Sequence, residues 1–269
     1  MDASQKHSVS VLSGRGRASA GDGWRLRHRG EARPLFGRHT PGTARAYRRI
    51  RITPNPRGKV LHPAIDLKLV NPDIGYGVFA TQDIPKGTII WALDPLDQII
   101  DQAKAKNLRD PADTQLKRYS WVNGSGDRIL CWDFGRFMNH CCEPTSVGPG
   151  KLEFEIAVRD IAAGEEVTCD YGTFNLEEPM TCACGSPHCR GQIVAEDFDR
   201  IAPILDLRVR AAFRDIQDVH QPLWPLVQKW RLQIERGIAQ PTHLPSLLEN
   251  RWPRVAVAAP SRQQRRANP

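Results

Sequence analysis

A cluster of three cysteines within eight residues constrains this chain more than any other feature; it reads Cys182-Ala-Cys184-Gly-Ser-Pro-His-Cys189. The glycine and proline inside it favour a tight turn, and such a turn cannot bury three free thiols. Structural zinc sites take four ligands in a closed tetrahedron, and cysteine thiolates are common donors. The cluster therefore predicts a zinc-binding turn whose fourth ligand lies elsewhere. Cys142 is the first candidate, and His188 is a local alternative.

The number of cysteines and the lengths of the apolar segments indicate the cellular compartment in which such a chain could act. The chain has seven cysteines in 269 residues, and its first residues, MDASQKHSVSVLSGRGR, contain no apolar segment of the kind that directs secretion. An odd number without a secretion signal favours a metal site in a reducing compartment over a disulfide framework. No apolar stretch approaches the roughly 20 residues of a membrane helix. We therefore expect a protein that is neither secreted nor membrane-bound, cytoplasmic in a bacterial-type cell or nuclear in a eukaryote. The arginine-rich start also fits an organelle transit peptide.

Charge divides the chain into three parts. Residues 1–58 carry 13 basic and three acidic side chains, and residues 251–269 carry five basic side chains and no acidic one. Because the whole chain has a formal charge of +8, residues 59–250 hold seven more acidic than basic side chains. We expect residues 1–58 and 241–269 to be basic, disordered tails, since they show no sustained apolar periodicity. Contact of these tails with nucleic acid is the alternative.

Between the tails, short β-type runs alternate with turn signals, which indicates a mainly β architecture. The runs that carry this prediction are residues 64–70, 76–80, 88–92, 128–132 and 152–158. Two segments have helical spacing instead, residues 97–107 and residues 195–240, the second broken by prolines. An amphipathic stripe in the second segment is expected to pack on the core; it consists of Leu223, Trp224, Val227, Trp230 and Ile234.

Three short motifs precede the cysteine turn: Gly75-Tyr-Gly77, Arg136-Phe-Met-Asn-His-Cys-Cys-Glu-Pro144 and Gly164-Glu-Glu-Val-Thr-Cys-Asp-Tyr-Gly172. Each alone is a weak signal, but together and in this order they resemble a SET-domain protein-lysine methyltransferase of the small stand-alone type, with a post-SET zinc knuckle. The resemblance implies a SET domain over residues 59–175, the knuckle over 176–194 and a helical extension over 195–240. It implies a mainly β fold of small, curved sheets around a pseudoknot.

The same resemblance implies a reaction and a set of site residues. S-adenosyl-L-methionine donates a methyl group to a lysine amine by direct in-line transfer. Tyr171 would lie beside the methyl-transfer channel, and Tyr119 would line the channel for the substrate lysine. The residues expected to hold the cofactor are Gly75, Tyr76, Gly77, Arg136, Asn139, His140 and Tyr171.

In relatives that have the knuckle, a cysteine at the position of Cys142 joins its three cysteines. The resemblance therefore implies one structural zinc ion held by Cys142, Cys182, Cys184 and Cys189.

Two departures from the family pattern carry expectations of their own. Cys169 stands where relatives mostly have Tyr or Phe, which favours di- or trimethylation over monomethylation. Relatives also often place an aromatic residue directly after the last cysteine, over the adenine of the cofactor. Here the nearest candidate is Phe198.

The acidic middle of the chain suits a basic protein substrate with an accessible lysine, such as a histone-like protein. Two alternatives stay open from the residues alone. One is a SET fold kept as a binding module with little or no activity. The other is a zinc-containing protein that binds nucleic acid through its basic tails. The sequence predicts no oligomeric state.

Overall fold

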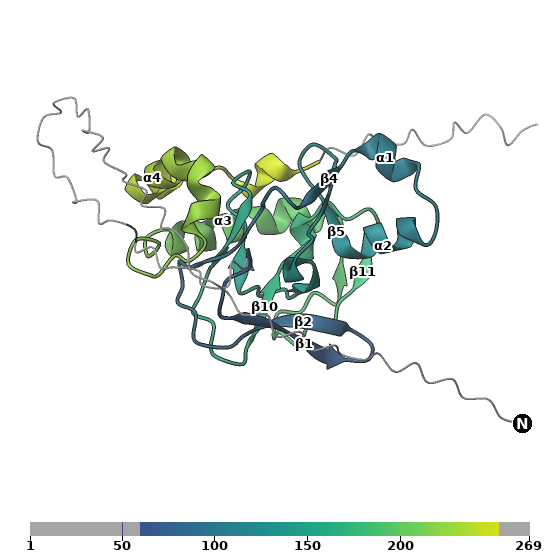
Figure 1. The fold of residues 1–269 in the computed structure, drawn as a ribbon, viewed down its shortest axis with the longest axis horizontal. Coiled ribbons are helices and arrows are strands. Elements are labelled where there is room, and N and C mark those ends of the chain that lie inside the picture. Colours follow the sequence, from purple (N-terminus) through teal and green to yellow (C-terminus); the bar gives the residue numbers. More distant parts are fainter. Residues whose placement is uncertain (1–49, 51–59, 253–269) are drawn as a thin grey trace, which may run out of the picture. The chain divides into compact units, whose positions relative to one another are not determined.

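The computed structural model describes residue 50 and residues 60–252 of the chain. All of the predicted N-terminal tail except residue 50, and residues 253–269 of the predicted C-terminal tail, therefore lie outside the described residues. Within them, the chain forms four small β-sheets followed by a group of helices (Figure 1). This arrangement confirms the predicted class, mainly β with a helical C-terminal part, whereas the pseudoknot stays a prediction.

The first sheet has the strand order β1-β2-β10-β7, with β1 (Ile65–Asn71), β2 (Gly75–Ala80), β10 (Glu166–Cys169) and β7 (Asn139–His140). The first two strands form an antiparallel hairpin. Its turn is fixed by the Asn71 side chain, whose Oδ1 accepts hydrogen bonds from the backbone N–H groups of Asp73 and Ile74. Gly75 closes the turn with φ of +88°, a conformation that side chains with a Cβ rarely adopt.

The second sheet places β9 (Phe154–Ala157) between β3 (Ile89–Ala92) and β8 (Ser146–Val147). Side chains of β9 alternate between two apolar clusters. Phe154 and Ile156 pack with helix α3 (Asp197–Ala212), whereas Ala157 belongs to the cluster that contains Trp91. Both faces of this sheet are therefore covered, and Glu155, opposite Trp91 in the register, points into the protein.

The third sheet contains β4 (Gln98–Ile100), β6 (Arg128–Leu130) and β5 (Ser120–Val122). The expected helix over residues 97–107 is wrong in its first part, because β4 pairs with β6 along its whole length. Helix α1 (Gln102–Lys106) begins only where the Asp101 side chain caps it. A second helix, α2 (Ala112–Tyr119), leads directly into β5.

The C-terminal helical region packs on the second sheet, as expected. Leu223, Trp224, Val227 and Ile234 of the predicted stripe are buried, and Trp230 packs against the same core. They belong to the 3₁₀ helix η3 (Trp224–Trp230), its N-terminal flank and helix α4 (Arg231–Ala239). Pro203 does not break α3, which runs through it.

The region assigned to the C-terminal tail differs from the expectation of disorder from residue 241 onward. Two further 3₁₀ helices, η4 (Pro241–His243) and η5 (Leu247–Asn250), follow α4. Leu244 and Leu247 are buried in the core, which fixes this segment to the fold. In the part of the chain that the structure describes, no helix has the length and apolar character to cross a bilayer.

Candidate active site and cysteine cluster

The parallel pairing of β7 with β10 brings the second and third sequence motifs together. Cys169 lies opposite His140 in the register. After β10 the chain turns into the 3₁₀ helix η2 (Tyr171–Thr173), whose first turn is capped by the Asp170 carboxylate. Tyr171 consequently lies beside His140, and its backbone N–H donates a hydrogen bond to His140 Nδ1 at 3.1 Å. Because Nδ1 accepts, His140 is neutral, and burial lowers its pKa in the same sense.

The Tyr171 hydroxyl is held as a hydrogen-bond donor. It donates to the backbone carbonyl of Met138 at 2.8 Å, and its ring stacks on Phe174. Burial raises the pKa of this hydroxyl far above its usual range, and the nearby Cys169 and Glu166 act in the same direction. The raised pKa and the hydrogen bond to Met138 both favour the neutral phenol.

The three motifs converge at Asn139. Its Nδ2 donates to Glu166 Oε1 at 2.7 Å and to the Tyr76 carbonyl at 3.1 Å. A Cβ at Gly77 would collide with the Glu166 carboxylate and the Asn139 amide, so a larger residue here would displace these two groups. Tyr76 keeps half of its surface exposed between its two flanking glycines. This end of the site offers an accessible aromatic ring beside tightly packed backbone.

Aromatic rings connect Tyr76 to Tyr119. Both contact Phe137, which ends the short 3₁₀ helix η1 (Phe134–Phe137), with ring centroids 6.0 Å and 5.7 Å apart respectively. The Arg136 guanidinium lies over the same ring at 4.9 Å. Arg136 and Tyr119 are thus placed next to each other by one shared phenylalanine.

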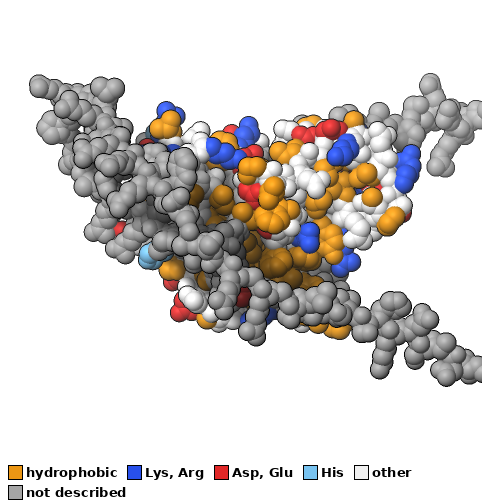
Figure 2. All heavy atoms as spheres, in the orientation of Figure 1, with side chains coloured by type: hydrophobic (Ala, Val, Ile, Leu, Met, Phe, Trp, Pro, Cys, Tyr) orange, Lys and Arg blue, Asp and Glu red, His pale blue; other side chains and the backbone are white. Residues whose placement is uncertain are grey.

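A cavity of about 800 Å³ lies on one side of this group. Figure 2 shows hydrophobic side chains in a hollow above β2, with basic side chains close to its rim. The predicted site residues form two groups, one that lines the cavity and one that does not. Those that line it are Tyr119, Arg136 and Tyr171; those that do not are Gly75, Tyr76, Gly77, Asn139 and His140. Met138, which directly precedes Asn139 in the chain, also lines the cavity.

The cysteines of the turn lie beside Cys142, although they are far from it in sequence. The Cys142 and Cys182 sulfurs are 3.9 Å apart, and the Cys182 and Cys189 sulfurs are 3.7 Å apart. Strands β11 (Met180–Thr181) and β12 (Gln192–Ile193) pair antiparallel and hold the ends of the turn together. The local alternative His188 lies outside this group, because its Nδ1 contacts Glu143 at 2.9 Å.

The donor set fits a tetrahedral zinc ion. Zinc–sulfur bonds of about 2.3 Å place tetrahedral sulfurs about 3.8 Å apart, close to the observed separations. Burial alone would raise the pKa of Cys184, but hydrogen bonds from backbone N–H groups and neighbouring thiols lower it to about 6. The donor atoms of His140, Cys142, Cys182 and Cys184 lie within 4.8 Å of one another. His140 is therefore a possible ligand that the sequence analysis did not consider, in competition with Cys189.

Arg190, directly after the last cysteine, joins the turn to the rest of the site. Its guanidinium lies 2.6 Å from Asp170 and 3.7 Å from Asp197, two carboxylates that are almost completely buried. Phe198, the nearest aromatic candidate, is fully buried in the core and is also one of the residues that line the cavity. An arginine, not an aromatic ring, occupies the position after the turn.

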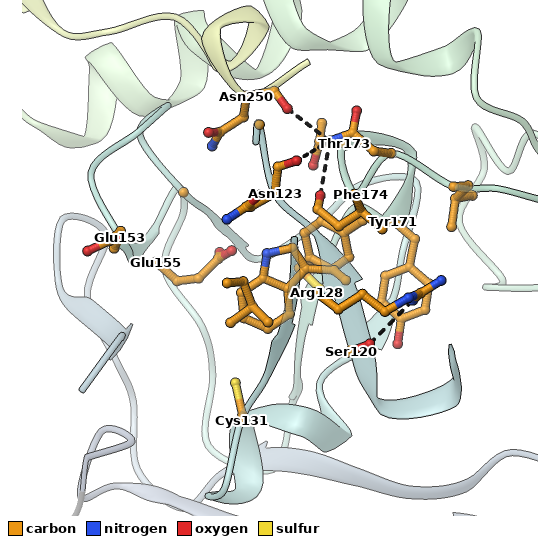
Figure 3. Close-up of a pocket in the computed structure, with 18 of the residues that line it drawn as sticks. Ser120, Asn123, Arg128, Cys131, Glu153, Glu155, Tyr171, Thr173, Phe174 and Asn250 are labelled. Carbon is orange, nitrogen blue, oxygen red and sulfur yellow. Dashed lines mark hydrogen bonds between the residues drawn. The ribbon is translucent and has the colours of Figure 1, made fainter. Parts of the chain in front are cut away.

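Glu155 is the residue of the cavity that the sequence analysis missed. It lines the cavity and its carboxylate points toward the middle, whereas Glu153 points away (Figure 3). Burial raises the pKa of Glu155 to about 7, and a hydrogen bond with Ser146 only partly opposes this shift. In the run 152–158 apolar and polar residues alternate, so Glu155 has the pattern of a solvent-facing strand residue. Nothing in the sequence indicates that this face of the strand is covered.

This fold and this site together define a SET domain. Residues 75–172 match the family model described as SET domain, and this part of the chain belongs to that family. The match contains the two glycines of β2, the Asn139–His140 pair and Tyr171, which are the residues assembled above.

Curated relatives carry the same domain within much longer chains. A histone-lysine N-methyltransferase named as H3 lysine-4 specific, from Eremothecium gossypii, is 33% identical over 127 residues, which are 38% of this chain and 13% of the relative. A protein of the same name from Saccharomyces cerevisiae is 34% identical over 129 residues, 38% of this chain and 12% of the relative. A mouse enzyme named as H3 lysine-36 specific is 30% identical over 129 residues, 44% of this chain and 5% of the relative. The chain thus spans 13% or less of these proteins.

Proposed function

We propose that this chain is a protein-lysine N-methyltransferase that moves a methyl group from S-adenosyl-L-methionine to the side-chain amine of a lysine. The observation that carries the proposal is the Tyr171 hydroxyl, fixed on the Met138 carbonyl at the cavity wall. Met138, which lines the cavity, directly precedes strand β7 with Asn139 and His140. A substrate entering from the cavity and a cofactor held at the Asn139 end would face each other there.

The residues around Asn139 fit such a cofactor. Gly75, Tyr76, Gly77, Arg136, Asn139 and His140 would hold it, with the half-exposed Tyr76 ring available for contact. S-adenosyl-L-methionine supplies an electrophilic methyl group on a positively charged sulfur. The protein's contribution is then to hold the two reactants in contact and in line, which supplies most of the rate gain in such reactions.

The two tyrosines orient the substrate amine. An ammonium has no lone pair, so the lysine must be neutral when it attacks. Because Tyr171 keeps its proton, it can position the amine through hydrogen bonding but cannot deprotonate it. Tyr119, which also lines the cavity and is held against Phe137, would guide the aliphatic part of the lysine.

We further propose one structural zinc ion at the cysteine cluster, with Cys142, Cys182, Cys184 and Cys189 as ligands. The sulfur separations support this set, and His140 is the alternative fourth donor. Zinc would stabilise the segment between β11 and β12, which has few other means of folding.

The substrate is expected to be a basic protein. The described region is the acidic part of the chain, which favours lysine-rich partners, and the relatives named above act on histone H3 according to their names. The protein would act in the nucleus of a eukaryote or in the cytoplasm of a bacterium.

The test is incubation of the zinc-loaded full chain with tritiated S-adenosyl-L-methionine and core histones, followed by detection of labelled protein. Label on lysine that depends on Tyr171 supports the proposal. If calorimetric titration detects no binding of S-adenosyl-L-methionine to the zinc-loaded protein, the proposal fails and the fold serves as a binding module.

A further inference from the structure

The Glu155 carboxylate lies on the floor of the cavity. It extends from the central strand of its sheet, opposite Trp91 in the register. A Cβ built on Gly148 would lie 3.6 Å from its Oε1, so the side chain passes close to the neighbouring strand segment. Its charge also contributes to the raised pKa of the Cys169 thiol, after burial, which places the two groups near each other. Figure 3 shows the carboxylate directed toward the rings at the centre of the cavity.

This carboxylate has an unsatisfied oxygen. Oε2 of Glu155 is buried and has no hydrogen-bond partner among the residues that the structure describes. Some charges of the cavity wall are paired, Arg128 with Glu177 and Glu153 with Lys229, and the guanidinium groups of Arg118 and Arg136 lie over aromatic rings. A buried charge without a partner is costly, and the cost falls when a cation binds beside it.

The surroundings of Glu155 fit a cation better than a neutral group. Burial raises the pKa of Cys169, so this thiol stays uncharged near Glu155. Trp91, Trp121 and Phe174 also line the cavity, and aromatic faces attract cations. The cavity therefore combines a buried carboxylate oxygen that has no hydrogen-bond partner with aromatic walls.

We propose that Glu155 binds the positively charged head group of the substrate side chain and so determines the preference of this cavity for a lysine-type cation. The inference rests on the proposed function for the identity of the substrate. During methyl transfer the positive charge moves from the sulfur to the amine nitrogen, and a carboxylate near the nitrogen favours that charge. Glu155 is thus a specificity-determining residue, in addition to the two tyrosines.

The test measures binding of n-butylammonium chloride and of 1-butanol to the zinc-loaded full chain by saturation-transfer NMR titration. n-Butylammonium reproduces the last four carbons and the charge of lysine, and 1-butanol is its neutral counterpart. We expect the wild type to bind the ammonium at least tenfold more tightly than the alcohol. In Glu155→Gln this preference should disappear, because the amide keeps the shape and removes the charge.

Glu153→Gln is the matched control, since it removes a carboxylate two residues away that is already paired with Lys229. It should retain the preference of the wild type. If Glu155→Gln prefers n-butylammonium over 1-butanol as strongly as the wild type does, the inference is overturned. The outcome is separate from that of the proposed function, because no methyl transfer is measured. If methyl transfer is also observed, Glu155→Gln should raise KM for a lysine substrate about tenfold.

Discussion

Arg190 and Asp170 form a hydrogen-bonded ion pair, 2.6 Å from nitrogen to oxygen, that ties the cysteine turn to the residue before Tyr171. The same guanidinium faces Asp197 at the start of α3, whose side chain is completely buried. One side chain therefore connects the turn, the third motif and the first C-terminal helix.

Replacing Arg190 should destabilise the whole fold. Arg190→Ala leaves the buried Asp170 carboxylate without its guanidinium and removes one of the two arginines that face the buried Asp197, so we expect the free energy of unfolding to fall by about 3–5 kcal/mol, measured by urea denaturation. Arg200→Ala is the control, because Arg200 also pairs with Asp197 but is exposed. Its effect should stay below about 1 kcal/mol. Equal effects of the two substitutions would contradict the connecting role of Arg190.

Tyr171→Phe should reduce turnover with little effect on the cofactor. The substitution removes only the hydroxyl that donates to the Met138 carbonyl. We expect kcat to fall by about a hundredfold or more, as is common when one oriented donor is lost from a catalytic site. Affinity for S-adenosyl-L-methionine, measured by calorimetry, should change by less than about threefold. Unchanged kcat would remove Tyr171 from the reaction.

Zinc content distinguishes the possible ligand sets. Purified protein should contain one zinc ion per chain, measured by inductively coupled plasma mass spectrometry, and Cys182→Ser should lose it. Cys131→Ala should retain the metal, because Cys131 is buried in a different cluster. Comparison of His140→Ala with Cys189→Ser identifies the fourth ligand by which of the two lowers the zinc content. A fully folded protein without zinc would contradict the site.

Cys169→Tyr should limit the number of methyl groups added. Cys169 is buried at the cavity wall, and the larger tyrosine would occupy space that a methylated amine needs. Mass spectrometry of the product should show di- or trimethyl-lysine with the wild type and mainly monomethyl-lysine with the variant. Cys169→Ser keeps a small side chain and should retain the wild-type products. Monomethyl-lysine as the only wild-type product would contradict this prediction.

Stability should depend on pH through Glu155. Its pKa rises from 4.5 in the unfolded chain to about 7 in the folded protein, so the folded state binds the proton more tightly. Protonation of Glu155 therefore stabilises the folded state, fully below about pH 4.5, and this contribution is lost as pH rises through 7. The free energy of unfolding falls by about 1.4 kcal/mol for each unit of difference between the two pKa values. The measurement is the unfolding free energy of the wild type minus that of Glu155→Gln, from pH 4 to pH 8. A difference that is independent of pH would show that the carboxyl is not buried in the folded state.

Much of the site was predictable because its residues lie in short motifs. Asn139, His140 and Tyr171 are assembled by the pairing of two strands whose sequences carry those motifs. The proximity of Cys142 to Cys182 was expected from the family resemblance, and the structure places their sulfurs in contact. At these positions the motifs, through the family resemblance that they carry, were sufficient.

Other features depend on what covers a surface, which local pattern does not reveal. Glu155 alternates with Phe154 and Ile156 as a solvent-facing residue would, yet its strand is central and both faces are covered. Residues 98–100 have helical spacing but pair with β6, because a neighbouring strand outweighs a short helical preference. Arg190 was read only as a missing aromatic residue, since its two carboxylate partners are distant in sequence.

The segment after residue 240 has a consequence for how the protein matures. Asn250 accepts a hydrogen bond from the buried Asn175 amide at 2.8 Å through its carbonyl, and its side chain donates to the Gly150 carbonyl at 2.6 Å. Leu247 and Asn250 also line the cavity, and Figure 3 shows Asn250 at its edge. The ribosome delivers these residues long after Tyr171, so the cavity wall closes only near the end of translation of the described region. A nascent chain would therefore lack this part of the cavity wall until the last segment docks.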